Sequence, residues 1–278
     1  MKSREASAFA SQKGSGIPSG DYIVFTEKVK TKTGIDLSLY KEDQMKRRLK
    51  TFYEKKGFSS FVSFFDDGLM KKDELFHQFL ERMTINVSEF YRNPSRWEQL
   101  EETIFPLLCK GSSVFKVWSA ACSTGEEPYT ISHMLNEAPY CSHYSILATD
   151  IDTNALLTAE KGIYTSHTLS AVHMARPGLL KKTEDGYEVS AHLRSKVTFK
   201  QLNLLGDAFD RQFDFISCRN VLIYFTESAK ADLYRKFYHS LKDGGILFVG
   251  STEQIFQPQQ FGFETAGPFL YKKNSRLL

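Results

Sequence analysis

The chain has 278 residues, 41% of them hydrophobic, and is nearly neutral, with 36 Lys and Arg against 33 Asp and Glu and a formal net charge of +3. This length and apolar content are sufficient for one main domain with a sizeable core and a second, smaller domain. A net charge this small does not by itself indicate a nucleic-acid partner. We find neither an apolar run long enough to span a membrane nor a signal peptide, which predicts a cytoplasmic protein without direct membrane insertion.

The spacing of cysteine and histidine argues against a metal site. The four cysteines form no C-x-x-C pair, and the seven histidines form no H-x-x-x-H pair or Cys/His cluster. We therefore expect reduced thiols and no bound metal.

The first quarter of the chain divides into a polar segment and a helical one. Residues 1–20 are rich in Ser, Gly and Ala and show no apolar period, so we expect a disordered tail. Residues 22–83 follow a helical pattern punctuated by Gly34 and Gly57, which predicts a small all-helical domain over residues 21–90. Its clearest amphipathic stripe consists of Leu75, Phe76, Phe79, Leu80 and Met83.

One helical segment of this domain is strongly basic. Between Lys41 and Lys56 there are seven Lys and Arg against three Asp and Glu, and the apolar residues keep helical spacing. Either this is an ordinary solvated helix face, or Lys46, Arg47 and Lys50 belong to a docking surface for an acidic partner.

From residue 114 onward, expected strands alternate with expected helices. This alternation predicts a mainly parallel sheet with helices on both faces, within an α/β domain that covers residues 91–278. Residues 162–196 interrupt it with polar sequence, either as a disordered excursion or as an inserted subdomain with a binding role. Segment 269–273 alternates in polarity and predicts a final edge strand. The other expected strands are Val114–Ser119, Tyr144–Thr149, Val197–Gln201, Phe213–Ser217 and Gly245–Val249, with helices from Glu126, over Thr153–Lys161 and over Glu227–Leu241.

Residues 117–129, V-W-S-A-A-C-S-T-G-E-E-P-Y, run from an apolar strand through a turn of small residues into an acidic helix start. Small side chains at the carboxyl end of a strand let a ligand approach the backbone, which is typical of a nucleoside-cofactor site, although an ordinary strand-turn-helix has the same outline. A dinucleotide site needs three spaced glycines, but here only Gly125 is present, and Glu126 and Glu127 would repel a phosphate. The two carboxylates suit instead the hydroxyls, amino group and sulfonium of S-adenosylmethionine. Asp150, at the end of the next strand, is placed to hold a ribose diol.

Two further segments combine polar and apolar residues. In residues 213–225 an apolar strand ends in Arg219 and Asn220, which predicts polar groups at the carboxyl edge of the sheet. Tyr224 follows, and a core tyrosine with a bonded hydroxyl is its simpler interpretation. In residues 84–93 polar groups, among them Ser88 and Arg92, alternate with apolar ones, as they also do in a plain half-buried strand.

Taken together, these segments make the chain resemble the chemotaxis receptor methyltransferases, the CheR-type protein-glutamate O-methyltransferase family, over residues 22–273. The matching motifs are N-V-S-E-F-Y-R, V-W-S-A-A-C-S-T-G-E-E-P-Y, A-T-D-I-D, N-L-L, C-R-N-V-L-I-Y-F and L-F-V-G-S-T-E. The resemblance implies a Rossmann-like S-adenosylmethionine-dependent methyltransferase domain, an N-terminal all-helical domain and a small β-subdomain inserted at residues 162–196.

The resemblance also implies a set of site residues. Ser88 stands where many relatives have threonine, and its hydroxyl keeps the role. Arg92 and Tyr224 match the residues nearest the transferred methyl group, and Arg219 matches a further arginine of the same motif, so these three are the catalytic candidates. The residues expected around S-adenosylmethionine are Asn86, Ser88, Arg92, Glu127, Asp150, Asn203, Leu204, Asn220 and Val221.

By the same resemblance, the methyl group would pass to specific glutamates on the cytoplasmic helical bundle of chemoreceptors. The products would be a glutamate methyl ester and S-adenosylhomocysteine, and the reaction would serve sensory adaptation. The helical domain would dock on receptor helices, which favours the docking interpretation of Lys46, Arg47 and Lys50. The enzyme would act as a monomer.

Two alternatives to this function remain. A nucleic-acid methyltransferase would share the cofactor fold, but the chain has neither an Asn/Asp-Pro-Pro-aromatic clamp nor a Pro-Cys nucleophile, and it shows no broad basic stripe interleaved with aromatic residues. A receptor adaptor that binds the cofactor without catalysis would keep the docking face. The presence of Arg92, Asp150 and Tyr224 together favours an enzyme over such an adaptor.

Overall fold

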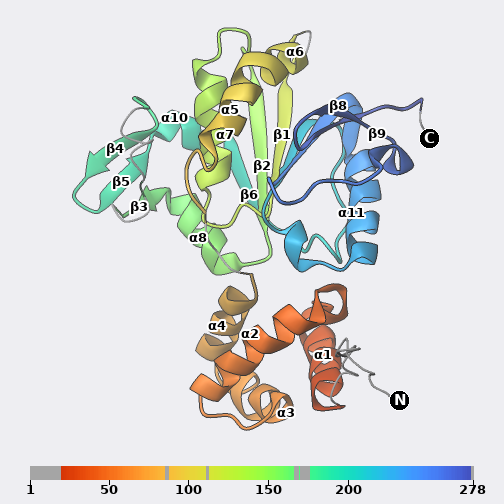
Figure 1. Cartoon of the computed structure of the whole chain (residues 1–278). Coiled ribbons are helices and arrows are strands. Elements are labelled where there is room, and N and C mark those ends of the chain that lie inside the picture. The colour runs from red at the N-terminus through yellow and green to blue at the C-terminus, as the bar shows by residue number, and fades with distance from the viewer. Residues whose placement is uncertain (1–19, 85–87, 111–112, 166–168, 170–175, 277–278) are drawn as a thin grey trace, which may run out of the picture.

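The computed structural model describes residues 20–84, 88–110, 113–165, 169 and 176–276. Helices occupy residues 20–84, and a domain built on a sheet follows them (Figure 1). The predicted tail lies outside the described residues except for Gly20, which begins the first helix. Among the helices of the described ranges, none is both long and apolar enough to cross a membrane.

The helical domain packs around a group of aromatic rings. Phe25 and Phe79 are fully buried, and their ring centroids lie 6.1 Å apart. The predicted apolar stripe in residues 75–83 is confirmed, with Phe76 only partly buried. Helix α2 buries Met45 and Leu49 on one face, which leaves most of its basic residues on the other. The elements are α1 (Gly20–Thr33), η1 (Leu37–Leu39), α2 (Glu42–Lys55), α3 (Phe61–Ser63), η2 (Phe64–Leu69) and α4 (Asp73–Thr84).

The sheet of the second domain has seven strands in the order β6-β2-β1-β7-β8-β10-β9. Strands β6 through β8 in this order are parallel, as the alternation predicts. The prediction of an edge strand at residues 269–273 is wrong, because β10 forms a hairpin with the preceding β9 and itself pairs with β8, which leaves β9 at the edge. The strands are β1 (Phe115–Ala120), β2 (Tyr144–Asp150), β6 (Val197–Gln201), β7 (Phe213–Cys218), β8 (Leu241–Val249), β9 (Phe263–Gly267) and β10 (Leu270–Lys273).

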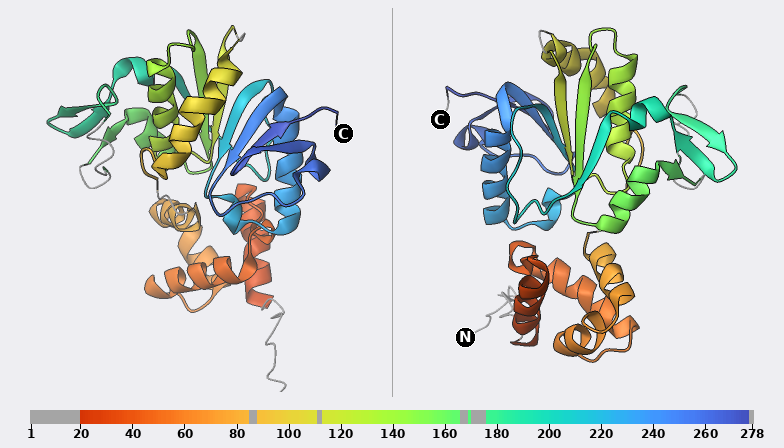
Figure 2. Two further views of the ribbon diagram at one scale, coloured as in Figure 1. Left: turned by 45° about the horizontal axis from the view of Figure 1, so that its top comes forward. Right: turned by 180° about the vertical axis from the view of Figure 1, so that it is seen from behind.

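Helices cover both faces of this sheet (Figure 2). On one face Phe105 of α6 packs edge-on against Phe215 of β7, with ring centroids 5.2 Å apart. On the other face Trp118 of β1 lies 5.6 Å from Phe237 of α11. Because both faces of the sheet are covered, the central strand β7 is buried along its whole length. The helical elements are α5 (Pro94–Gln99), η3 (Leu100–Ile104), α6 (Phe105–Cys109), α7 (Glu126–Glu137), α8 (Thr153–Lys161), η5 (Leu222–Tyr224), α11 (Glu227–Ser240) and η6 (Pro258–Phe261).

Between α8 and β6 the chain leaves the main sheet and forms a small antiparallel sheet at the side of the domain (Figures 1 and 2). Its strands are β3 (Ile163–Tyr164), β4 (Leu180–Thr183) and β5 (Gly186–Val189), and the short α10 (Ala191–Arg194) leads back to β6. The insertion is therefore an ordered subdomain in its described part, and residues 166–168 and 170–175 lie outside that part.

The two domains are joined by a second contact besides the chain itself. Tyr40 and Phe225 form an antiparallel bridge, with hydrogen bonds from Lys41 N to Tyr224 O (2.8 Å) and from Thr226 N to Leu39 O (2.9 Å). A single apolar cluster continues from the aromatic core of the helical domain to β1, β7 and α11. The helical domain thus packs directly against the segment that follows β7.

Candidate functional site

The carboxyl ends of four parallel strands meet at one edge of the sheet. Ala120, the last residue of β1, is paired with Thr149 of β2 and Cys218 of β7, and Asp150 is paired with Gln201 of β6. The segments that follow these strands therefore begin side by side, where open α/β sheets bind their ligands. A pocket lies at this edge, and the predicted residues that line it are Ser88, Arg92, Glu127, Asp150, Asn203, Leu204, Arg219, Asn220, Val221 and Tyr224. Asn86 lies outside the described residues.

The turn after β1 has a strained backbone that gives a ligand access to the main chain. Ala121, Ser123 and Gly125 have positive φ values of 60°, 50° and 94°, a region that residues with a β-carbon rarely adopt. A β-carbon on Gly125 would lie 2.8 Å from Cβ of Ala159, so only glycine fits where α7 begins against α8. Strain of this kind persists only where surrounding contacts hold it, and here Asp150 accepts the Ser123 N–H at 2.8 Å.

Asp150 is the most buried acid of the pocket lining. Its side chain accepts hydrogen bonds from Ser123 N and from Asp152 N (2.9 Å), one on each oxygen. Burial raises the pKa of Asp150, and these two N–H donors partly oppose the increase. A carboxylate oxygen accepts more than one hydrogen bond, so Asp150 is equipped to receive the hydroxyl groups of a bound ligand as well. This arrangement fits a ribose diol.

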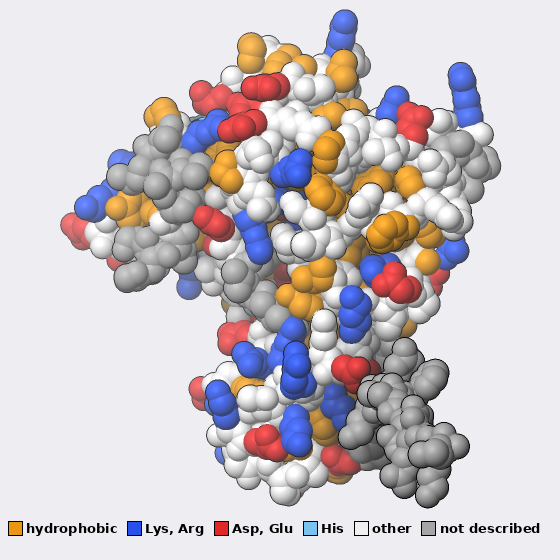
Figure 3. All heavy atoms as spheres, in the orientation of Figure 1, with side chains coloured by type: hydrophobic (Ala, Val, Ile, Leu, Met, Phe, Trp, Pro, Cys, Tyr) orange, Lys and Arg blue, Asp and Glu red, His pale blue; other side chains and the backbone are white. Residues whose placement is uncertain are grey.

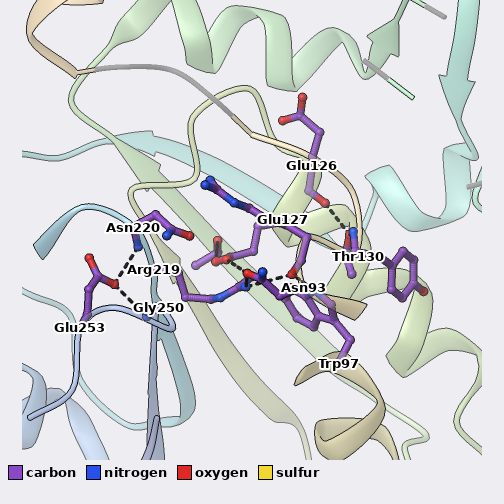
Figure 4. Close-up of polar contacts among 12 residues, drawn as sticks. Asn93, Trp97, Glu126, Glu127, Thr130, Arg219, Asn220, Gly250 and Glu253 are labelled. Carbon is purple, nitrogen blue, oxygen red and sulfur yellow. Dashed lines mark hydrogen bonds and ion pairs between the residues drawn. The ribbon is translucent and has the colours of Figure 1, made fainter. Parts of the chain in front are cut away.

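The two glutamates of the turn point in different directions (Figure 4). Glu127 lines the pocket, and its Oε1 accepts the Ser119 hydroxyl at 2.8 Å. Glu126 is buried away from the pocket and accepts the Thr124 hydroxyl at 2.7 Å. The expectation that both carboxylates face the ligand is therefore wrong for Glu126. The reason is the helix itself, because successive side chains at its start are rotated by about 100°.

Arg219 is the ionic partner of Glu127. Its Nη1 lies 3.3 Å from Glu127 Oε2 (Figure 4). The guanidinium also contacts the rings of Trp97 and Phe248, with 4.9 Å from its central carbon to each ring centroid. The Arg219 side chain is only 3% exposed. Burial lowers the pKa of Arg219, and the charge of Glu127 opposes that decrease. Both members of this ion pair line the pocket.

A tight turn places Arg92 at the pocket. Its neighbours Tyr91 and Asn93 have positive φ values of 49° and 63°, and Tyr91 N donates to the Thr130 hydroxyl at 3.1 Å. Nη2 of Arg219 donates to the Arg92 carbonyl oxygen at 2.9 Å and to Asn93 Oδ1 at 3.1 Å. The alternative of a plain strand is wrong for residues 88–93, which turn and carry no ladder. Arg219 thus fixes the backbone on which Arg92 is mounted.

The helical domain supplies a wall that the sequence reasoning missed. Three of its residues line the same pocket: Tyr40, Met83 and Thr84. Arg48 of α2 lies 5.1 Å from the ring centroid of Tyr224 and donates from Nη1 to the Met83 carbonyl oxygen at 2.9 Å. Tyr224 is half-buried and faces the pocket, so it is not a core tyrosine. The one feature of the sequence that could have indicated this wall is the position of Arg48 within the basic helical segment.

The predicted docking residues lie on α2, where Lys and Arg side chains gather on the face of the helical domain seen in Figure 3. Arg47 is exposed. Lys46 and Lys50 form i,i+4 ion pairs with Glu42 and Glu54, each at 3.8 Å, and ion pairs at the surface are weak. Both lysines therefore remain accessible to a stronger acidic partner.

Comparison with known proteins identifies the chain. Residues 20–84 match the family described as CheR methyltransferase, all-alpha domain, and residues 86–268 match CheR methyltransferase, SAM binding domain. The chain is 43% identical to the chemotaxis protein methyltransferase of Listeria monocytogenes over 256 residues, which are 91% of this chain and 97% of the relative. It is 34% identical to that of Borreliella burgdorferi, over 87% of this chain and 89% of the relative.

Among solved structures, the glycopeptide N-methyltransferase MtfA superposes loosely, with a TM-score of 0.37 and 16% identity over 58% of this chain and 54% of that chain. The two family matches and the two relatives agree with each other. The chain belongs to the CheR family of S-adenosylmethionine-dependent chemotaxis methyltransferases.

Proposed function

We propose that this protein transfers the methyl group of S-adenosylmethionine to the side-chain carboxylate of specific glutamates on chemoreceptors. The products would be a glutamate methyl ester and S-adenosylhomocysteine. The observation that supports this best is that Arg92 and Tyr224, which can donate to a carboxylate, line the same pocket as the acids Asp150 and Glu127. The name of the relatives, chemotaxis protein methyltransferase, supports a chemoreceptor as the source of the glutamates.

The residues of this chain fit the cofactor by their chemistry. Asp150 would accept the ribose hydroxyls, and Glu127 would lie near the positive charge of the ligand. The backbone of the strained turn at residues 121–125 lets the ligand approach without a side chain in the way. The remaining contacts would come from Ser88, Arg92, Asn203, Leu204, Asn220 and Val221, with Asn86 as a further candidate.

The proposed transfer needs no general base. When bound, S-adenosylmethionine supplies a methyl group activated by a sulfonium. A glutamate side chain has an ordinary pKa of about 4.3 and is already ionised at neutral pH. Arg92 and Tyr224 would orient this carboxylate through N–H and O–H donors and replace part of its water shell. Because the charge on the attacking oxygen disappears toward the transition state, these donors act by orientation, and tight binding of the charge would slow the transfer.

The experiment that tests this function measures labelled methyl transfer from S-adenosylmethionine to receptor-containing membranes, followed by mild alkali to release methanol. The wild-type protein should give alkali-labile label on the receptor. Arg92→Ala and Tyr224→Phe should reduce turnover, while Tyr224→Phe should leave the affinity for S-adenosylhomocysteine, measured by calorimetry, near the wild-type value. Normal turnover in both variants would remove these residues from the proposed role.

The proposed docking surface has its own test. Lys50→Glu reverses an exposed charge on α2, so it should raise the receptor concentration needed for half-maximal rate without changing cofactor affinity. Lys272→Glu, on β10 of the other domain, is the matched control and should change neither. Equal receptor kinetics for wild type and Lys50→Glu at low salt would contradict docking through this face.

A receptor adaptor without catalysis is distinguished in the same assays. If the wild-type protein is such an adaptor, it will bind S-adenosylhomocysteine and give no label on any receptor. If no receptor is labelled, a nucleic-acid acceptor is the next substrate to test.

A further inference from the structure

Glu253 ends the motif L-F-V-G-S-T-E, four residues after β8, and it does not line the cofactor pocket. Its side chain is buried and points at the loop that follows β7 (Figure 4). Oε2 of Glu253 accepts the backbone N–H groups of Asn220 and Gly250, both at 2.7 Å, and Oε1 accepts the N–H of Ile223 at 3.2 Å. One carboxylate therefore ties the end of β8 to the loop that carries Asn220 and Tyr224.

The chemistry of this contact favours a carboxylate. Three backbone donors converge on two oxygens, and a buried N–H that loses its acceptor costs free energy. An ionised carboxylate has acceptors alone, whereas the amide of glutamine would turn an NH2 group toward one of these donors. Burial raises the pKa of Glu253, and the hydrogen bonds from the backbone partly oppose the increase. A buried carboxylate that accepts three backbone N–H groups fixes the positions of the backbone segments that donate them.

The backbone around the contact depends on it. Asn220 has a positive φ of 62°, a conformation that asparagine tolerates better than most residues but that still requires support. A β-carbon on Gly250 would contact Oε2 of Glu253 and would lie 2.9 Å from Asn220 N. Glycine at 250 is thus what allows the carboxylate to reach Asn220.

We propose that Glu253 is a positioning residue for methyl transfer, which holds Asn220 against the cofactor and Tyr224 toward the acceptor. The part that concerns Tyr224 rests on the proposed function. The effect on Asn220 is measured by cofactor affinity alone and does not depend on the identity of the methyl acceptor. The two parts are therefore measured separately, by binding and by turnover.

The test compares Glu253→Gln with the matched control Glu264→Gln, which changes a half-exposed acid paired with Lys272 on the β9 edge strand. In Glu253→Gln we expect the dissociation constant for S-adenosylhomocysteine, measured by calorimetry, to rise by about tenfold or more. We also expect kcat per binding site to fall by a similar factor. Glu264→Gln should match the wild type in both. Glu253→Asp, which keeps the charge but is shorter by one methylene, should recover part of the affinity.

A role in folding alone would reduce the number of binding sites found by calorimetric titration and leave the dissociation constant and kcat per site unchanged. That result would overturn the proposal. If Glu253→Gln does not fold, Gly250→Ala keeps the carboxylate but displaces it from Asn220, and it should weaken S-adenosylhomocysteine binding in the same way. Wild-type affinity in folded Gly250→Ala would also overturn the proposal. If the wild type binds S-adenosylhomocysteine but methylates no receptor, the proposed function fails, while the affinity of Glu253→Gln still decides the role at Asn220.

Discussion

Replacing Arg219 by methionine tests how much the buried ion pair with Glu127 contributes to the stability of the fold. Methionine has a similar length and keeps the apolar contacts with Trp97 and Phe248, but it removes the charge and the donors. Glu127 would lose its ionic partner at 3.3 Å, and the Arg92 carbonyl oxygen would lose a donor at 2.9 Å. The change therefore leaves a largely buried carboxylate without its counter-charge, although the hydrogen bond from the Ser119 hydroxyl remains.

The expected loss of stability follows from that burial. Removing one partner of a buried ion pair costs about 3–5 kcal/mol, because the remaining charge is left uncompensated. For a chain of this size about 1 kcal/mol corresponds to about 2 °C, so Arg219→Met should lower the melting temperature by about 6–10 °C. Arg219→Met combined with Glu127→Gln removes both charges and should lose less than the sum of the two single variants, by about 1–3 kcal/mol.

The assay is urea unfolding followed by circular dichroism, with the two single variants, the double variant and the wild type. The coupling between Arg219 and Glu127 is the free energy of unfolding that the single variants lose in excess of the double variant. Additive losses, within about 0.5 kcal/mol, would refute the argument that this pair acts as a unit. A loss below about 1 kcal/mol for Arg219→Met would contradict the cost assigned to its burial.

Two further predictions concern the acid of the pocket and the turn that carries Arg92. Burial raises the pKa of Asp150, and its ionised form is the better acceptor for hydroxyls, so protons should compete with the ligand. The affinity for S-adenosylhomocysteine, measured by calorimetry, should fall as the pH decreases through this raised pKa and stay constant above it. In Asp150→Asn the affinity should be weaker and should not show this pH dependence. Tyr91→Phe removes the hydroxyl that contacts His133 Nδ1 at 2.7 Å and should reduce the free energy of unfolding by about 1–2 kcal/mol in urea; an unchanged midpoint would mean that the hydroxyl contributes nothing.

The sequence was sufficient to predict how the pocket is assembled. The apolar runs of β1, β2 and β7 indicate parallel strands. Polar residues lie at the ends of β2 and β7, and β1 leads through a turn of small residues into an acidic helix start. Since the carboxyl ends of neighbouring parallel strands meet, Glu127, Asp150 and Asn220 were expected at one edge, and the structure brings them into one pocket. The chemical roles of these residues remain predictions.

Directions and long-range contacts were not predictable from one sequence. Glu126 and Glu127 are adjacent and equally acidic, and only the rotation of the first turn of α7 separates a buried contact with Thr124 from a place in the pocket. Glu253 follows an apolar strand as many surface acids do, and its burial depends on the approach of the β7 loop. Similarly, Tyr40 reaches the pocket only because the helical domain docks on Phe225.

The distribution of charge in the pocket suits a reaction in which charge disappears. In the proposed transfer, a sulfonium cation and a carboxylate anion would become a neutral thioether and a neutral ester, so a site that stabilised both charges fully would favour the reactants. Glu127 is already paired with Arg219, which reduces the negative potential it presents to the ligand. Asp150 is held by two N–H donors and is placed to bind hydroxyls. The acids of this pocket therefore suit recognition of the cofactor without strong stabilisation of its cationic ground state, which agrees with the orienting role proposed for Arg92 and Tyr224.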